Sequence, residues 1–244
     1  GFLLSAVGLP ILGVIAVAKS DGLSNLASRV HPRFAKIFTL LIYLSIGPCL
    51  AIPRTASTSY EMAITPMLSS NLLAYKGYIQ IIYSVVFFII ALYIAYNPEK
   101  LSDRLGKVLC PLLLCLILII FVKSFSQQMI YSAGLSDYEH QPLIRGFLDG
   151  YMTMDAIAAL NFGIIISLNI KNKGIKQEKD IIKSTIKAGI IAGICLTIVY
   201  CMLMHIGGLA GYYTGYHSNG TQTLIAIVSF MFKDIGVIIL GAIF

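Results

Sequence analysis

Long apolar runs alternate with short polar stretches along the whole chain. The runs are Gly1–Ala18, Ile37–Pro53, Ile79–Tyr96, Val108–Val122, Gly146–Ile170 and Ala188–Gly211, with a last one at Gly236–Phe244. Most of them approach the ~20 residues that an α-helix needs to cross ~30 Å of hydrocarbon. The pattern therefore predicts six membrane-spanning helices and the start of a seventh.

Helices suit these runs better than strands do. Lipid offers backbone N–H and C=O groups no partner, and the runs lack the strict alternation of a membrane-spanning strand. Two shorter apolar stretches predict helices outside the spans, one around Leu23–Val30 and one at Leu224–Phe232. We expect the second to lie near the external membrane interface. The sequence thus predicts one all-α integral membrane domain over residues 1–244.

The composition excludes a soluble protein. Of the 244 residues, 57% are hydrophobic and 12% are charged, whereas roughly 25% are charged in typical soluble domains. The mean hydropathy is +0.84. The lipid bilayer is therefore the expected environment.

Lysine and arginine residues fall on alternate loops. Loops 19–36, 97–107 and 171–187 hold 4, 3 and 6 of them, whereas loops 54–77, 123–145 and 212–222 hold 2, 2 and none. By the positive-inside rule the first three loops are cytoplasmic, so the first span runs from outside to inside. The net charge of +7 comes mostly from this bias, and we expect no nucleic-acid partner.

The chain opens at Gly1, inside an apolar run, without an initiator Met or the basic segment of a signal peptide. A first span that starts outside needs an earlier segment to bring the chain there. We therefore expect an internal piece of a longer protein, which lacks at least one N-terminal span and the part after Phe244.

The metal-ligating residue types are scattered. The five cysteines lie in or beside apolar runs without the spacing of a metal site, so we expect them to pack as small apolar residues. Only His205 lies inside a predicted span. It shares a helix face with Cys201, but two ligands fall short of a zinc site. Packing or a single polar contact is the expectation for His205.

Polar residues first interrupt the apolar pattern in "GPCLAIPRTASTSYE", residues 47–61. Gly47-Pro48 and then Pro53 are expected to break the helix and to free backbone carbonyls. If the helix resumes after Pro53, Arg54 and Glu61 lie on one face, two turns apart. The hydroxyl side chains around them are Thr55, Ser57, Thr58 and Ser59. The pair suits an external gate, a structural lock, or an ion pair at the membrane interface.

The second polar interruption is "GFLDGYMTMDAIAALNFG", residues 146–163. Asp155 lies about 14 Å along a helix from Gly146, near the midplane, where a carboxylate is expensive and usually functional. Gly150 would allow an unwound turn, and its carbonyls with Thr153 and Asp155 could coordinate a cation such as Na+. Asn161 follows on the same span. The alternative is that Asp155 only caps a half-helix or pairs with a neighbour.

Sequence motifs for enzymes are missing from the chain. It has no HExxH, no Walker loop, no nucleophile elbow and no cluster of metal ligands. Asp149 and Asp155 lie on one predicted span, whereas the two carboxylates of an aspartic-protease pair must converge from two segments. We expect neither an enzyme nor a cofactor.

The stretches "GPCLAIPRTASTSYEMAITP" and "GFLDGYMTMDAIAALNFGIIISLNI" resemble the branched-chain amino acid:cation symporters of prokaryotes, the LIVCS or BrnQ-type family. The opening "GFLLSAVGLPILGVIAVAKSDG" is similar to the second transmembrane helix of that family. The resemblance implies the APC superfamily and a LeuT-like fold of two inverted five-helix repeats. The chain would then hold transmembrane helices 2–7 and the start of helix 8.

The same resemblance implies a multi-pass transporter of the prokaryotic plasma membrane. It would import leucine, isoleucine and valine with Na+, or with H+, by alternating access. By position in the motif, Gly150, Tyr151, Thr153 and Asp155 fall in the substrate and ion region. Tyr151, Met152 and Met154 are candidates for the apolar pocket of the substrate side chain. Residues 47–61 would belong to helix 3, beside the pathway.

Two rival readings stay open. Another APC-type carrier would move a different small solute and would have a polar pocket in place of the methionines. A membrane sensor would bind an amino acid without moving it, and such proteins usually carry an additional soluble signalling domain. The coupling ion and the oligomeric state do not follow from the sequence.

Overall fold

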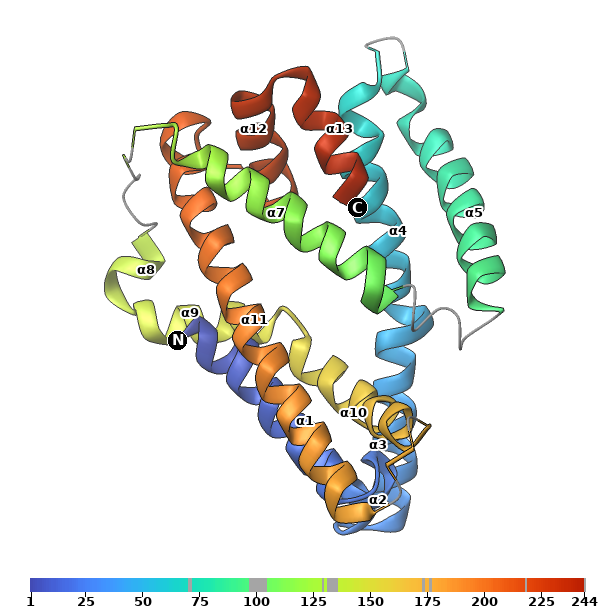
Figure 1. Cartoon of the computed structure of the whole chain (residues 1–244). Helices are drawn as coiled ribbons and strands as arrows, with labels where there is room; N and C mark the ends of the chain where they lie inside the picture. The colour runs from blue at the N-terminus through green and yellow to red at the C-terminus, as the bar shows by residue number, and fades with distance from the viewer. Residues whose placement is uncertain are drawn as a thin grey trace. The chain divides into compact units, whose positions relative to one another are not determined.

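The structure is a computed structural model, which describes residues 1–69, 72–96, 105–128, 130, 136–172, 174–175, 177–217 and 219–243. Every regular element within these residues is helical (Figure 1). The all-α class predicted from the apolar runs is therefore confirmed. Most of loop 97–107 lies outside the described residues, so its cytoplasmic position stays a prediction.

The helices follow the predicted runs closely. In chain order they are η1 (Leu4–Gly8), α1 (Leu9–Lys19), α2 (Leu23–Ser28), α3 (Pro32–Leu44), η2 (Ser45–Cys49), α4 (Ala51–Ala63), η3 (Thr65–Met67), η4 (Leu73–Tyr75), α5 (Lys76–Ala95), η5 (Leu105–Leu109), α7 (Cys110–Ser124), α8 (Ser136–His140), α9 (Pro142–Tyr151), α10 (Asp155–Asn172), α11 (Glu178–Tyr213), α12 (Gly220–Phe232) and α13 (Asp234–Ile243). Helices were thus expected in the right places, including α2 and α12 outside the predicted spans.

Fewer helices than predicted have the length of a full span. By length and composition, Pro32–Met67, Lys76–Ala95 and Glu178–Tyr213 qualify. The bent pair Pro142–Tyr151 and Asp155–Asn172 qualifies as a fourth span. Among the described residues, the first and fourth predicted spans form shorter apolar helices, Leu4–Lys19 and Cys110–Ser124. The apolar helices fit a membrane protein, and the expected number of crossings stays a prediction.

The chain divides into two compact units. Unit 1 consists of Gly1–Ala51 and Ala133–Ile198, and unit 2 consists of Ile52–Ser132 and Val199–Phe244. One division falls just after η2, and the other falls within α11.

In unit 1, small residues let helices approach one another closely. A Cβ atom on Gly146 would lie 3.2 Å from the backbone nitrogen of Phe2, so α9 runs close to the start of the chain. On α11, a Cβ on Gly189 would lie 3.1 Å from Cγ1 of Val14, and one on Gly193 would lie 2.5 Å from Cδ1 of Ile11. Two glycines four residues apart are a common device for close helix packing in membranes.

Unit 2 has an apolar core built by α7, α11, α12 and α13. Its buried members are Ile120, Ile206, Ala210, Ile227, Val228, Met231 and Leu240. The two fully buried residues of α12, Ile227 and Val228, show that this helix packs its apolar face into unit 2. A helix was correctly expected there, and its expected position near the membrane interface stays a prediction.

His205 packs against aromatic rings, whereas the cysteines are exposed. The ring of His205 stacks on Phe125 and meets Phe121 edge to face, with ring centroids 4.9 and 5.4 Å away. The predicted packing role of His205 is confirmed. All five cysteines are free and exposed, and the expectation that they pack as small apolar residues stays a prediction. Within the described residues, no three His, Cys, Asp or Glu side chains lie close enough to hold a metal ion.

Candidate functional site

The helix of residues 142–172 is broken in its middle. α9 ends at Tyr151, α10 begins at Asp155, and the two axes are bent by 43°. Met154 takes a φ of 64°, in the left-handed region that is uncommon for residues with a side chain. The chain therefore unwinds in the stretch where the sequence predicted a broken helix.

Gly150 does not make this break. It lies inside α9, where a Cβ atom would come within 2.3 Å of Oγ of Ser5 and 2.5 Å of the carbonyl oxygen of Phe2. The Ser5 hydroxyl donates a hydrogen bond of 2.7 Å to the carbonyl of Phe147 at the same contact. The expected role of Gly150, freedom to unwind, is thus corrected. The residue is small because η1 packs directly on it.

Oxygen atoms gather where the chain unwinds. Oγ1 of Thr153 lies 2.7 Å from the carbonyl oxygen of Gly150 and 3.0 Å from Oδ2 of Asp155. Both neighbours are acceptors, whereas a hydroxyl carries one proton to donate. The Gly150 carbonyl also accepts hydrogen bonds from the backbone N–H groups of Met152 and Thr153. Asp155 is also the first residue of α10, where the helix dipole favours negative charge.

An apolar cavity of about 210 Å³ lies in unit 1, next to this break. Its lining is Val7, Pro10, Ile11 and Val14 from η1 and α1, then Asp155, Ala158, Ala159, Phe162 and Ile166 from α10, and Gly189, Ala192, Gly193 and Leu196 from α11. Asp155 is the one charged residue in this lining. A carboxylate thus lies at the edge of an otherwise apolar space.

The structure places only some of the predicted substrate and ion residues next to one another. Thr153 and Asp155 come together, and Asp155 reaches the cavity. Tyr151 and Met152 are 51% and 67% exposed and do not line this cavity, and neither do Met154 and Asn161. Sequence reasoning missed α1 and α11 as cavity walls. The signals were the spacing of Val7, Ile11 and Val14 and the pair Gly189 and Gly193.

Asp149 belongs to a different polar cluster. It accepts a hydrogen bond from the Tyr138 hydroxyl, and Nε of Arg145 lies 3.5 Å from its Oδ2. The hydrogen bond to Asp149 raises the pKa of Tyr138, and burial and the negative charge add to this rise, while Arg145 opposes it. Asp149 and Asp155 thus have separate partners.

The other polar interruption follows α3. Gly47 has a non-helical ψ of −120°, and Leu50 has a φ of −132°, so the predicted break at Gly47-Pro48 is confirmed. α4 already begins at Ala51. Pro53 therefore lies in its first turn, where the missing N–H breaks no helical hydrogen bond. The expected second interruption at Pro53 was wrong for this reason.

The polar face of α4 in unit 2 is partly used for packing on α5. Ser59 and Tyr83 share a short hydrogen bond, and the amide of Gln80 lies 3.4 Å from Oγ of Ser57. Arg54 and Thr55 are exposed, and Glu61 is half-buried. Seven residues span about 10 Å of helix axis, and no ion pair joins Arg54 and Glu61 in the described structure. Their gate role stays a prediction.

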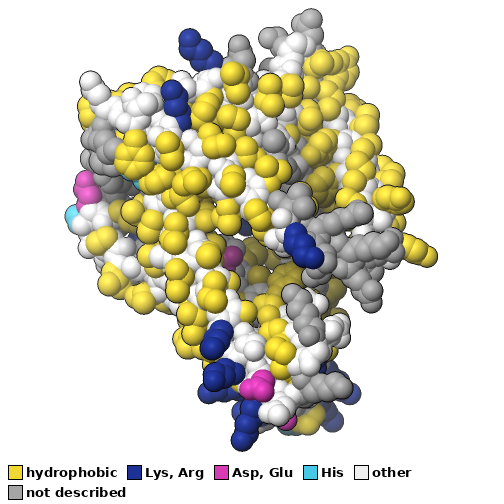
Figure 2. Space-filling view, in the orientation of Figure 1, with side chains coloured by type: hydrophobic (Ala, Val, Ile, Leu, Met, Phe, Trp, Pro, Cys, Tyr) yellow, Lys and Arg dark blue, Asp and Glu magenta, His cyan; other side chains and the backbone are white. Residues whose placement is uncertain are grey.

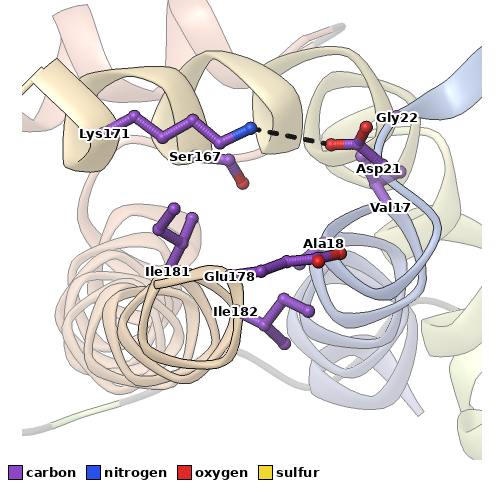
Figure 3. Close-up of a pocket in the computed structure, with 9 residues that line it drawn as sticks. All are labelled: Val17, Ala18, Asp21, Gly22, Ser167, Lys171, Glu178, Ile181 and Ile182. Carbon is purple, nitrogen blue, oxygen red and sulfur yellow. Dashed lines mark ion pairs between the residues drawn. The ribbon is translucent and has the colours of Figure 1, made fainter. Parts of the chain in front are cut away.

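Loops 19–36 and 171–187 meet at one end of unit 1. Figure 2 shows several Lys and Arg side chains gathered at the end where Figure 1 places α2. Nζ of Lys171 lies 3.8 Å from Oδ1 of Asp21, beside a space of about 20 Å³ (Figure 3). The Glu178 side chain points from α11 towards Ala18 in the same view. Two of the predicted cytoplasmic loops thus lie together.

Comparison with known proteins connects this geometry to a family. The family model described as "Branched-chain amino acid transport protein" matches residues 1–244. The "Branched-chain amino acid permease BraB" of Bacillus subtilis (strain 168) is 40% identical over 244 residues, 99% of this chain. The "Putative branched-chain amino acid carrier protein SAR1419" of Staphylococcus aureus (strain MRSA252) is 42% identical over 212 residues, 84% of this chain.

These relatives are longer than the present sequence. They cover 54% of the Bacillus protein and 46% of the Staphylococcus protein, so the chain spans about half the length of these relatives. No solved structure matches the chain significantly.

Proposed function

The chain belongs to the branched-chain amino acid transport protein family, and on that premise we propose that the whole protein is a secondary active transporter. It imports leucine, isoleucine and valine across the plasma membrane by alternating access, driven by a gradient of Na+ or H+. The relatives are named permeases and carriers, which are transporters and not enzymes.

The observation that carries this proposal is the break between α9 and α10, with Thr153 and Asp155 in it. Unwound backbone within a membrane helix is tolerated where it lines a cavity or is buried in protein, and transporters use such breaks to hold substrates and ions. The first N–H groups of α10 suit a substrate carboxylate, because they have no partner within the helix. The carboxylate of Asp155 suits a cation.

The oxygens around Thr153 support cation coupling in particular. A Na+ ion would be held by the carbonyl of Gly150, the Thr153 hydroxyl and Asp155. Alternatively, a proton on Asp155 would let the carboxylic acid donate a hydrogen bond to Thr153. Na+ and H+ are therefore alternative coupling ions for the same group of oxygen atoms. The proposed substrate and ion region is completed by four further residues around the break, Tyr151, Met152, Met154 and Asn161, beside Gly150, Thr153 and Asp155.

The other candidate residues, in the stretch after α3, suit a polar pathway for the solute. Charged side chains within apolar helices are expensive and mark routes for polar solutes. We assign this role to the stretch after α3, and the residues are Gly47, Pro48, Pro53, Arg54, Thr55 and Glu61. In a LeuT-like arrangement, α3 to α4 would be helix 3, and α9 to α10 would be helix 6.

The test is uptake of labelled leucine by the full-length protein in proteoliposomes. An inward Na+ gradient, an inward H+ gradient and no gradient are compared for the parent and for Asp155→Asn. Asp180→Asn is the matched control, because Asp180 is exposed near the start of α11. We expect gradient-driven uptake in the parent and the control, and a loss of at least ~100-fold in Asp155→Asn.

Two outcomes would favour the rival functions. Leucine binding without accumulation under either gradient would favour a sensor over a transporter. Gradient-driven uptake of another small solute, with no competition by leucine, isoleucine or valine, would favour a carrier with a different substrate.

A further inference from the structure

Helix α11 is longer than the hydrocarbon layer of a membrane is thick. Its 36 residues extend over about 54 Å, whereas the layer measures ~30 Å. All its Asp, Glu, Lys and Arg residues lie between Glu178 and Lys187, and the apolar part follows. The hydrocarbon therefore begins after Lys187, and the first turns of α11 extend into the headgroup layer and the water.

Three lysines in these first turns lie on one face of α11. Lys179, Lys183 and Lys187 follow one another at intervals of four residues, which places them one above the other. All three are exposed. On the opposite side of the helix, Ile181 and Thr185 are buried. The three residues, here called the lysine face, thus point away from the side on which α11 packs.

Isoleucines continue the lysine face into the membrane. Ile190, Ile191, Ile194 and Ile198 are between 43% and 63% exposed. Together with the lysines they fall within about 120° around the helix axis. Exposed isoleucines on a helix long and apolar enough to cross a membrane suit the acyl chains of lipids. The lysine face lies on the same side and further out, so it is at the level of the headgroups.

The lysine face carries an excess of positive charge. No ion pair joins its lysines to an acidic side chain within the part of the chain that the structure describes. The Glu178 side chain points towards Ala18 instead (Figure 3), which leaves Asp180 as the acidic residue on this side of α11. Like charges four residues apart on a helix repel each other. An anion bound along this face would remove the repulsion.

Helix α3 of unit 1 repeats this order of basic and apolar residues. Arg33 and Lys36, near its start, are exposed. Ile37, Leu40 and Leu41, further along the helix, are 60%, 58% and 55% exposed. The basic starts of α3 and α11 belong to the two loops that lie together at one end of unit 1. Two separate helices therefore place basic residues just outside an exposed apolar stretch.

From these observations we propose that the lysine face of α11 binds an anionic phospholipid. The phosphate group contacts Lys183 and Lys187, and the acyl chains lie along the exposed isoleucines. The distribution of Lys and Arg assigns this end to the cytoplasm, and the cytoplasmic leaflet is the one that carries anionic lipids. The inference concerns a lipid partner and does not depend on which solute the protein moves.

Titration of the full-length protein with lipid is the direct test. Native mass spectrometry in detergent counts the bound molecules of phosphatidylglycerol, which is anionic, and of phosphatidylcholine, which has no net charge. The test variant is Lys183→Gln/Lys187→Gln. The matched control is Lys123→Gln/Lys233→Gln, because these lysines are exposed, lie in unit 2 and give the same change of net charge.

The expected result is a loss of lipid selectivity in the test variant alone. One basic residue near the surface raises the affinity for anionic lipid roughly fivefold. Phosphatidylglycerol should therefore bind the test variant at least ~10-fold more weakly than the parent, while phosphatidylcholine binds both equally. Lys183→Arg/Lys187→Arg keeps the charge and should bind as the parent does. If the glutamine variant does not fold, loss of phosphatidylglycerol from the parent at high salt is the second measurement.

Three outcomes would overturn the lipid site. The parent could bind phosphatidylglycerol no better than phosphatidylcholine, in which case the lysines serve only to orient the chain. The test and control variants could lose the same affinity, which would make net charge the cause. Millimolar glycerol 3-phosphate, which has the phosphate group without acyl chains, could displace the lipid, and the face would then bind soluble phosphates instead. Leucine uptake by the parent tests the proposed function separately from all three.

Discussion

The two helix breaks of the chain look alike in sequence and differ in structure. Both follow an apolar run and combine Gly with polar residues. At the break after α3, the non-helical angles belong to Gly47 and Leu50, and polar side chains come later, on α4. At the break before α10, the Thr153 hydroxyl lies 2.7 Å from the Gly150 carbonyl oxygen and 3.0 Å from the Asp155 carboxylate. The second break thus brings polar groups together, whereas the first does not.

Close packing explains part of this difference. Gly150, just before the α9–α10 break, is covered by η1, whereas a Cβ on Gly47 would meet no atom within 4 Å. The break before α10 is thus supported by a neighbouring element, and its polar atoms are held in place. A break that carries function needs such support, because binding groups must keep their geometry.

The largest expected effect is that of adding a methyl group at this support. Gly150→Ala puts a Cβ within 2.5 Å of Oγ of Ser5 and of the carbonyl oxygen of Phe2, and overpacking of this kind costs about 1–3 kcal/mol. Gly207→Ala is the control, since Gly207 on α11 has open space around its Cβ position. Thermal unfolding of the full-length protein in detergent should show a lower midpoint for Gly150→Ala alone. Equal midpoints would show that the contact with η1 does not support the break.

The contribution of the hydroxyl at the break is expected to be smaller. Thr153→Val removes the group between the Gly150 carbonyl and Asp155 and keeps the shape of the side chain. A hydrogen bond contributes about 0.5–1.5 kcal/mol, which corresponds to an apparent affinity for the driving ion that is up to ~10-fold weaker. Thr223→Val is the control, because the Thr223 hydroxyl donates to the carbonyl of Asn219, at the start of its own helix. If both variants keep the parent's ion dependence, Thr153 is not an ion ligand.

Much of the fold followed from the sequence, and the site followed only in part. Apolar runs fix helices locally, so α5, α7 and α11 were expected where they lie. The break in residues 146–163 was also expected, but the close packing on Gly150 was not, because it comes from Phe2 and Ser5. Such contacts between distant residues leave no local pattern. The cavity was missed for the same reason, since its walls come from three separate segments.

The cluster of Tyr138, Arg145 and Asp149 offers a test through pH. Because Tyr138 donates to Asp149 and its pKa is raised above the ordinary value of 10.0, the neutral phenol is favoured in the folded protein. The stabilisation is complete below about pH 10 and is lost as the pH rises through the raised pKa. Tyr138→Phe should therefore unfold at a lower temperature than the parent at pH 8, and the gap should close above pH 10. A gap that is constant with pH would exclude this titration as the cause.

The smallest effect is expected at the charged end of unit 1. Lys171 and Asp21 form an ion pair of 3.8 Å, but their side chains are 46% and 78% exposed. Exposed pairs contribute about 0.2–1 kcal/mol, because water screens the charges and two long side chains lose freedom. Lys171→Met, Asp21→Asn and the double variant should thus give a coupling energy below ~1 kcal/mol in a double-mutant cycle of unfolding. A value of several kcal/mol would mean that this contact, rather than the packing on Gly150, holds α10 in place.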